Sequence, residues 1–492
     1  MKVVNTTSAK LLSRFIGTLV FSTACSIAAH AASAQTDADA ASIQHGQYLA
    51  IASDCIACHT AKDHGKPFAG GYRFDTPMGT IVSSNITPSK TAGIGNYSEA
   101  DFARAVREGK RPDGSNLYPA MPYTEYALMT DDDVKSLYAY FMQGVAPVDE
   151  APAEKTALKF PFGLPGVMSI WNALYLNHDR FKPDANVSLL VNRGHYLVDG
   201  LAHCTTCHTG RNTMMALDQS AYLGGAVVGG WYAPNITSDK VSGIGGWSDA
   251  QLTAYLRTGH VRGLAQAGGG MAEAIENSFR KLDDHDIDAI VAYLRTVAPI
   301  RTPGQTTPSY AADPKRDVAW TDFEKPIPGN DSAERFATTE SNGAALYSAA
   351  CAACHGVHGH GTEDSTFPPL THNSAVGALE PNNVVMAIAQ GVHRKGADGE
   401  VSMPAFSAED ERITDSLSDD QIAAVTNYVT EQFGRGNAQL TGADVKVIRE
   451  GGRPSFLIRN ASTLAFGGII AGAFVIVLAA CVLRRRRSKT RV

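Results

Sequence analysis

The sequence predicts an all-α protein with three helical domains in tandem and one transmembrane helix near its C-terminus. Two observations support this fold class. The pentapeptide Cys-x-x-Cys-His occurs three times at nearly equal intervals, starting at positions 55, 204 and 351, and helix-start signals follow the copies. Near the C-terminus, residues 464–483 form an apolar run without a charged residue.

The composition is that of a globular protein. Of the 492 residues, 44% are hydrophobic and 19% are charged, which excludes a wholly disordered chain, collagen and a polytopic membrane protein. The net charge is −6, and basic residues concentrate at the two ends, so the body between them is more acidic still. An acidic body argues against nucleic acid as a partner, because contacts to phosphate require Lys and Arg.

Proline-rich and polar stretches separate the three repeats. Residues 147–183 join the first repeat to the second, and residues 299–328 join the second to the third. We therefore expect a signal peptide at 1–34, a first domain at 35–148, a linker at 149–186, a second domain at 187–300, a proline-rich linker at 301–335, a third domain at 336–440, a juxtamembrane segment at 441–463, the transmembrane helix at 464–483 and a basic cytoplasmic tail at 484–492.

The N-terminus resembles a secretory signal. Lys10 and Arg14 precede an apolar stretch, and Ala32-Ser33-Ala34 then provides a cleavage site before Gln35. An uncleaved anchor and a lipoprotein signal ending at Cys25 are the alternatives. The apolar stretch is short for an anchor, and Ser22 stands where a lipoprotein signal requires a large aliphatic residue.

The run at 464–483 has the length of a membrane span. At about 1.5 Å per residue it is roughly 30 Å long, the thickness of one hydrocarbon core. Arg484 to Arg487 follow at once and favour a cytoplasmic location for that end. The predicted topology is an exported body, one span and a short basic tail. The alternative is a buried core helix with a basic end.

Six cysteines form three pairs, each followed directly by histidine. This arrangement is the attachment signature of c-type haem: the two thiols form thioethers to the haem vinyl groups, and the histidine binds the iron. Zinc sites and redox-active pairs also use Cys-x-x-Cys, but no spare cysteines could complete a four-cysteine zinc site beside each pair. Structural disulfides between the pairs are a further alternative, but they leave the three histidines unexplained. We expect three covalently bound haems c, held by Cys55, Cys58, Cys204, Cys207, Cys351 and Cys354, with His59, His208 and His355 as proximal ligands.

Other residues repeat with the pentapeptides. Residues 85–87 and 235–237 both read Asn-Ile-Thr, and this segment is missing from the third copy. Helices are predicted to start at capping boxes formed by Ser98 with Asp101, Ser248 with Gln251 and Ser418 with Gln421. Each copy should close with a helix, at 131–141, 283–294 and 418–433. Comparable tyrosines lie on these closing helices, and we expect them to pack in the core: Tyr138, Tyr293 and Tyr428.

A haem iron that only transfers electrons takes a sixth ligand, most often methionine. Met121, Met271 and Met403 each precede a predicted closing helix and are expected in loops. Core packing is the alternative for each of them. Met129 and Met142 occupy predicted helical positions and are assigned to the core. His358 and His360 lie in a glycine-rich loop, where exposure to solvent is favoured over a metal role.

No enzyme signature accompanies the haem motifs. The sequence contains no dinucleotide or phosphate loop, no His-Glu-x-x-His and no Gly-x-Ser-x-Gly. Irons with both axial positions filled leave no coordination site for a substrate. The predicted role is therefore electron transfer without catalysis by this chain.

The haem pentapeptides, the paired Asn-Ile-Thr segments, the stretch His178–Pro183 and the Met-bearing segments together carry a family resemblance. The chain resembles the three-haem cytochrome c subunit of bacterial membrane-bound dehydrogenases, a group that serves gluconate, sorbitol, fructose and alcohol dehydrogenases. The resemblance implies three tandem class I cytochrome c domains on the periplasmic side of the inner membrane. The clear C-terminal span favours the gluconate, sorbitol or fructose type over the alcohol type.

By the same resemblance, the partners are a large catalytic subunit that contains flavin or pyrroloquinoline quinone, a small third subunit in some complexes, and ubiquinone in the membrane. Two other functions stay open on the sequence alone. One is a stand-alone, membrane-anchored multihaem carrier of a respiratory chain or oxidase. The other is a haem enzyme such as a peroxidase, in which one iron lacks methionine.

Overall fold

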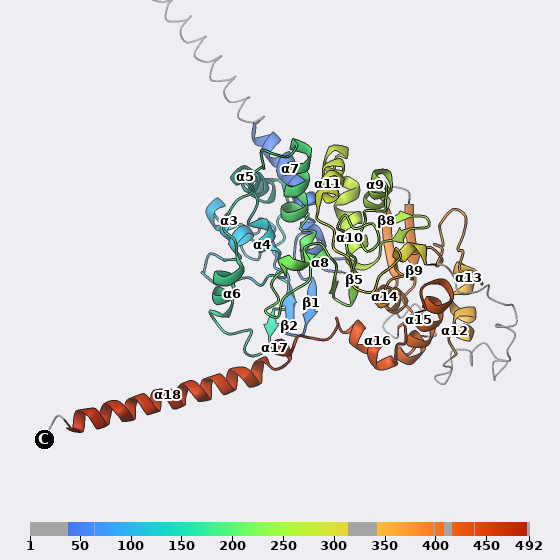
Figure 1. Cartoon of the computed structure of the whole chain (residues 1–492). Helices are drawn as coiled ribbons and strands as arrows, with labels where there is room; N and C mark the ends of the chain where they lie inside the picture. The colour runs from blue at the N-terminus through green and yellow to red at the C-terminus, as the bar shows by residue number, and fades with distance from the viewer. Residues whose placement is uncertain are drawn as a thin grey trace, which may run out of the picture.

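The computed structural model describes residues 38–62, 64–312, 342–396, 399–407, 416–436 and 438–489, with side chains as far as Cys481. The predicted signal peptide and Cys25 therefore lie outside the described residues. A mainly helical body carries one long C-terminal helix that extends away from it (Figure 1). The predicted helical character is confirmed, but the described part of the chain also contains four small antiparallel sheets, which the prediction of an all-α fold missed.

The first domain starts with a helix at residues 38–52. The predicted capping box at the start of helix α3 is formed: the Ser98 hydroxyl accepts a hydrogen bond from the Asp101 N–H, and the Asp101 carboxylate accepts one from the Ser98 N–H. The further elements are α2 (Cys55–Cys58), β1 (Arg73–Thr76), β2 (Gly79–Val82), α3 (Glu99–Glu108), α4 (Tyr123–Tyr126), α5 (Asp131–Ala139) and the π-helical turn η1 (Tyr140–Gly144).

The second domain repeats this order of elements. Ser248 and Gln251 form the equivalent capping box, and Asp283 is the N-cap of the closing helix. The elements are α7 (Leu189–Tyr196), η2 (Leu197–Leu201), α8 (Thr205–His208), η3 (Gln219–Ala221), β4 (Ala226–Val228), β5 (Trp231–Ala233), α9 (Asp249–Thr258), β6 (His260–Val261), β7 (Ala265–Gln266), α10 (Gly269–Asn277), η4 (Phe279–Lys281), α11 (Asp284–Thr296) and η5 (Ser309–Ala311).

The third domain is shorter, and its closing helix begins at a capping box of Ser418 and Gln421. The predicted juxtamembrane segment contributes to it, because Val445 and Ile448 of α16 are buried in its core. The elements are α12 (Gly343–Ala350), α13 (Ala352–His355), α14 (Asn382–Gln390), β8 (Val392–Gly396), β9 (Gly399–Met403), α15 (Asp419–Phe433) and α16 (Gly442–Arg449).

The segment predicted as the first linker contains regular structure. Strand β3 (Ala157–Leu158) pairs with β2 and extends the β1–β2 hairpin to three strands, and α6 (Val167–Tyr175) follows it. The remaining sheets are two-stranded hairpins, β4–β5, β6–β7 and β8–β9. The first linker is thus packed against the first domain rather than extended between domains.

The first and last helices of each domain cross in direct backbone contact. A Cβ atom on the crossing glycine would lie 1.9, 1.9 or 2.3 Å from a main-chain oxygen, for Gly46 against Ser136, Gly194 against Ala289 and Gly343 against Ala424. Real side chains do not approach so closely, so only glycine permits this crossing. The crossing holds the helix before each pentapeptide against the closing helix.

The closing helices show one error in the sequence comparison. The residue that packs on the crossing glycine is Tyr140 in the first domain, and it is equivalent to Tyr293 and Tyr428. The prediction used Tyr138 instead. Tyr140, Tyr293 and Tyr428 lie at the same distance from the N-caps of their closing helices, Thr130, Asp283 and Ser418, and Tyr138 does not.

The C-terminal helices are α17 (Phe456–Arg459) and α18 (Ala461–Lys489). Within α18, residues Ala461–Cys481 are long and apolar enough to cross a membrane, with a mean hydropathy of 2.5, and none of this stretch is buried in the protein. A helix without a buried face is not a core helix. This excludes the alternative of a buried core helix for the predicted span.

The first and second domains share one hydrophobic core that extends from Leu49 to Val297, whereas the third domain has a core of its own. Side-chain amides of α14 connect the third domain to β5 of the second: Asn383 accepts from the Tyr232 N–H at 2.8 Å and donates to the Tyr232 carbonyl at 2.9 Å. The second domain therefore contacts both of the others.

Candidate functional site

Each pentapeptide forms a single helical turn. The short helices α2, α8 and α13 hold the two cysteines of each pair three residues apart, which places both thiols on one face. In the first two domains a residue in the left-handed backbone region precedes the first cysteine: Asp54 with φ 49° and His203 with φ 39°. All six motif cysteines are free thiols in the structure.

The three motif histidines make the same contact. Nδ1 of His59, His208 and His355 lies 2.8, 2.7 and 2.9 Å from the main-chain oxygen of Ser84, Pro234 and Pro368, respectively. A carbonyl can only accept, so Nδ1 carries the proton and Nε2 presents its lone pair. Burial lowers the pKa of all three imidazoles, and the carbonyl contact only partly opposes this. Burial is the larger of the two effects, so the neutral, metal-binding form is favoured.

The repeated Asn-Ile-Thr segments position two of these carbonyl groups. Asn85 follows Ser84, and its Oδ1 accepts from the N–H and hydroxyl of Thr87 at 2.9 and 2.7 Å. Asn235 makes the same two bonds with Thr237, again at 2.9 and 2.7 Å. These buried turns therefore fix the backbone that faces the histidine.

The third domain reaches the same geometry with different residues. Pro368 supplies the carbonyl, and the buried Asn373 amide donates to the neighbouring Pro369 oxygen at 3.0 Å. This substitute was not predicted from the sequence. The available signal was an asparagine close to a Pro-Pro pair, but its distance from the motif differs from that in the other two copies.

The three predicted methionine ligands lie in different elements, all partly buried beside the core. Met121 is in the predicted loop, just before α4. The expectation of a loop was wrong for Met271, which lies in the first turn of α10, and for Met403, which ends β9. Local structure thus differs among the copies. Met129 is buried in the core as predicted, although outside a helix, and it also lines the cavity described next.

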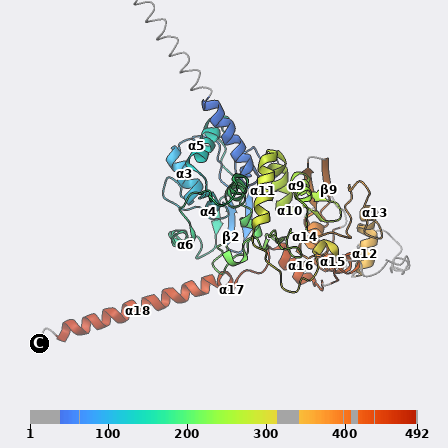
Figure 2. The ribbon, with the colours of Figure 1, turned by 45° about the horizontal axis from the view of Figure 1, so that its top comes forward.

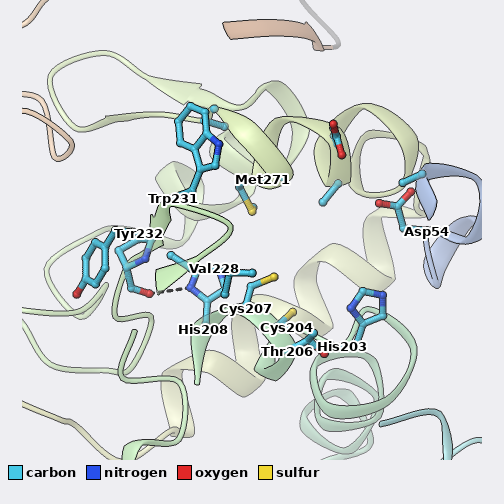
Figure 3. A pocket seen from close by; sticks show the side chains of 18 of the residues that line it. Asp54, His203, Cys204, Thr206, Cys207, His208, Val228, Trp231, Tyr232 and Met271 are labelled. Carbon is cyan, nitrogen blue, oxygen red and sulfur yellow. Dashed lines mark hydrogen bonds between the residues drawn. The ribbon is translucent and has the colours of Figure 1, made fainter. Parts of the chain in front are cut away.

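One continuous cavity of about 1330 Å³ connects the three motifs, and its lining is mainly apolar. It exceeds the roughly 300–1,000 Å³ of a single small-molecule pocket. All twelve predicted site residues line it: Cys55, Cys58, His59, Met121, Cys204, Cys207, His208, Met271, Cys351, Cys354, His355 and Met403. Figure 3 shows Met271 across the cavity from Cys204, Cys207 and His208.

This donor set fits haem c and does not fit zinc. Thiol pairs, a neutral imidazole and a thioether around an apolar space are what a His/Met-ligated haem requires. Burial raises the pKa of the Cys55, Cys58, Cys204 and Cys351 thiols to about 12. Among the described residues no group of three or more His, Cys, Asp or Glu side chains could hold a metal ion.

Other histidines lie outside this arrangement or at its edge. His358 and His360 are exposed, as predicted. His203 lines the cavity, with its ring 5.6 Å from that of Tyr126. Trp231 was not singled out from the sequence, yet it lines the cavity between the second and third domains, and its Nε1 donates to Gln390 at 3.3 Å. Figure 3 shows its indole close to Met271.

Several known proteins are similar to this chain in sequence. The cytochrome c family matches residues 43–144, 191–298 and 340–432. The chain is 45% identical to the fructose dehydrogenase cytochrome subunit of Gluconobacter japonicus, over 91% of this chain and 92% of that protein. It is 37% identical to the gluconate 2-dehydrogenase cytochrome c subunit of Pantoea cypripedii, over 89% and 95%. It is 38% identical to the cytochrome c subunit of the quinone-type alcohol dehydrogenase of Gluconacetobacter polyoxogenes, over 88% and 89%. The chain therefore belongs to the cytochrome c family, whose domains bind haem c covalently, and within it to the electron-transferring cytochrome subunits of dehydrogenases.

Proposed function

We propose that this chain carries three covalent haems c, one in each domain, and passes electrons from a catalytic dehydrogenase subunit to ubiquinone in the inner membrane. The haems supply the chemistry, since each iron takes up and releases one electron. The single observation that supports this best is the common cavity, because all three sets of thiols, imidazole and thioether line one connected space. Such a space keeps the three centres together in one body.

The chain's own residues do four things in this proposal. The paired thiols would hold each haem, and Nε2 of each motif histidine would bind the iron. Met121, Met271 and Met403 would each supply a thioether ligand to the iron, which would leave no site for a substrate. The carbonyl oxygens of Ser84, Pro234 and Pro368 orient the imidazoles and hold them in the tautomer with the proton on Nδ1. The apolar lining excludes water and lowers the reorganisation that accompanies each electron transfer.

The partner is inferred from the relatives. We propose a large catalytic subunit with flavin or pyrroloquinoline quinone that oxidises a sugar, sugar acid or alcohol. The identity of 45% with the fructose type, against 38% with the alcohol type and 37% with the gluconate type, favours a sugar substrate. Helix α18 would anchor the complex with the haem domains on the periplasmic side and the arginine tail inside.

Purification of the native complex from membranes tests this function. The chain should co-purify with a large subunit, retain haem stain after denaturation and carry the added mass of three haem groups. Substrate should reduce its haems only when the large subunit is present, and ubiquinone should reoxidise them. Oxidation of substrate by the isolated chain, or a mass for two haems, would contradict the proposal. Purification without any dehydrogenase subunit would favour a stand-alone carrier.

The axial ligands have a separate test. Met271→Ala should open one iron to carbon monoxide and lower the potential of that haem, because the thioether favours the ferrous state. Met214→Ala is the matched control, since Met214 is in the same domain, is 46% exposed and does not line the cavity. An unchanged spectrum and titration in Met271→Ala would show that another group ligates the second haem.

A further inference from the structure

A surface segment between the first two domains is apolar although it faces solvent. Residues 160–177, here called the apolar segment, contain no charged residue. Within it Leu164, Ile170 and Leu174 are 45%, 68% and 65% exposed. Large exposed aliphatic side chains that cluster in this way mark an interaction surface.

The outer face of α6 is the apolar one because the inner face is fixed to the body. Asn172 Oδ1 accepts from the Tyr123 hydroxyl at 2.7 Å, Met168 is buried, and Asn116 donates to the Ser169 hydroxyl at 2.8 Å. In a nine-residue helix, Val167, Ile170 and Leu174 then share the opposite face. The helix cannot rotate to bury them without breaking these bonds.

The apolar segment is attached to the start of the long C-terminal helix. The ring of Phe160 stacks on that of Phe466 with centroids 4.8 Å apart, and the Ser462 hydroxyl donates to the Phe160 carbonyl at 2.7 Å. Figures 1 and 2 both show α6 on the side of the body from which α18 extends. If α18 crosses the bilayer, the membrane surface therefore lies close to Phe160 and α6.

We propose that the apolar segment is a second membrane contact, in which α6 lies along the bilayer surface and the side chains of Leu164, just before α6, and of Ile170 and Leu174 insert among the lipid tails. This inference rests on the proposed membrane anchor. The occupant is lipid rather than the catalytic subunit because the exposed side chains continue the apolar surface of α18, where Leu464 and Phe466 are also exposed. The charges that flank the segment are of both signs, so the contact is hydrophobic rather than electrostatic.

The contact would place the first domain next to the membrane. The loop that carries Met121 is bonded to the apolar segment through Asn116 and Tyr123, and the Tyr118 hydroxyl donates to the Phe162 carbonyl at 2.8 Å. Of the three methionine-bearing segments, the one in the first domain thus lies directly under the proposed lipid contact. A quinone dissolved in the bilayer would meet this domain first.

The experiment uses the native full-length complex in lipid nanodiscs that contain a phospholipid with a photoreactive diazirine in its tail. After illumination, peptides are mapped by mass spectrometry. Peptides from 160–177 and from 464–481 should both carry label. The double variant Ile170→Glu with Leu174→Glu should reduce label in 160–177 at least several-fold and leave label in 464–481 unchanged. Both residues are exposed, so the haem spectrum should stay that of the parent.

Leu189→Glu is the matched control, because Leu189 is 86% exposed on α7 and lies outside the apolar segment. It should change neither peptide. Absence of label in 160–177, with 464–481 labelled, would overturn the second contact while leaving the anchor intact. Protein cross-links from 160–177 to the catalytic subunit, without lipid label, would also overturn it. Absence of label in 464–481 would instead refute the anchor itself.

Discussion

The two interfaces that join the three domains are built in different ways. Between the first and second domains the contacts are reciprocal. The Tyr48 hydroxyl donates to Asp286 at 2.7 Å, and the equivalent Tyr196 hydroxyl donates to Asp133. The N–H groups of Asp283 and Thr130, at the N-caps of the two closing helices, each donate to the opposite tyrosine oxygen at 3.2 Å.

The interface between the second and third domains has no such symmetry. Asn382 and Asn383 use their side-chain amides to bind the backbone of Gly230 and Tyr232 in and beside β5. The nearly fully buried Arg394 donates to the Ala267 carbonyl at 3.1 Å. Backbone groups of the second domain accept or donate these bonds, and side chains such as Trp231 and Arg262 add bonds to Gln390 and to the Thr362 carbonyl, with no equivalent pair among them.

This difference follows from geometry. When two copies bury the same surface against each other, the pair is closed and has no equivalent surface left for another copy. A third copy can join only through a new surface. The sequence of the third domain is correspondingly divergent, since it lacks the Asn-Ile-Thr segment and obtains its histidine contact from Pro368.

The largest expected effect is at the closed pair. Asp286→Asn should destabilise the haem-loaded protein by about 3 kcal/mol, because Arg193 and Tyr48 both lose a buried carboxylate. The measurement is the free energy of unfolding in denaturant. The mirror variant Asp133→Asn should cost less, since no arginine is bonded to Asp133 among the described contacts. Equal losses of unfolding free energy in the two variants would show that the two carboxylates contribute equally to stability.

The second effect concerns the unsymmetrical interface. Arg394→Leu should destabilise the protein by about 2 kcal/mol, because the Ala267 carbonyl loses a charged donor in a buried position. Lys395→Leu is the control, since its side chain is 47% exposed. The unfolding transition of the third domain should shift, and that of the first two should not. A uniform shift of the whole transition would mean that the three domains unfold as one unit.

A smaller effect is expected at the amide pair. Asn383→Ala removes the two hydrogen bonds to Tyr232 and should cost about 1 kcal/mol, because water can replace part of the interaction at this half-buried site. Thermal unfolding of the variant checks this. A loss as large as that of Arg394→Leu would identify the amides as the main connection to the third domain.

The smallest effect near neutral pH is the pH dependence of the stability that Asp286 gives to the pair of first and second domains. Burial raises the pKa of Asp286, but the hydrogen bonds from Arg193 and Tyr48 outweigh it, so the pKa is lowered. Asp286 therefore stabilises the fold above about pH 3.9, the unfolded value, and this stability is lost as the pH falls through the folded pKa. The stability difference between the parent and Asp286→Asn should shrink in acid. A constant difference would show that the charge is not involved.

The sequence predicted the parts that depend on short-range chemistry. The pentapeptide spacing and the three capping boxes involve residues only a few positions apart, and the boxes at Ser98, Ser248 and Ser418 formed as expected. The single cavity, the reciprocal tyrosines and the amides on β5 join residues far apart in the chain, and nothing in the local pattern signals them. Tyr138 was matched with Tyr293 and Tyr428, although Tyr140 lies at the equivalent distance from the N-cap Thr130 and packs on the crossing glycine.

The packing of the motifs has a consequence for biogenesis. Cys351 is only 9% exposed in the folded chain, and burial raises the pKa of the Cys55, Cys204 and Cys351 thiols to about 12. Thioether formation needs thiols that an attachment machinery can reach. We therefore expect the chain to receive its haems while the pentapeptides are still open. Maturation and final folding are in this sense one ordered process, and a chain that folds too early is lost for haem attachment.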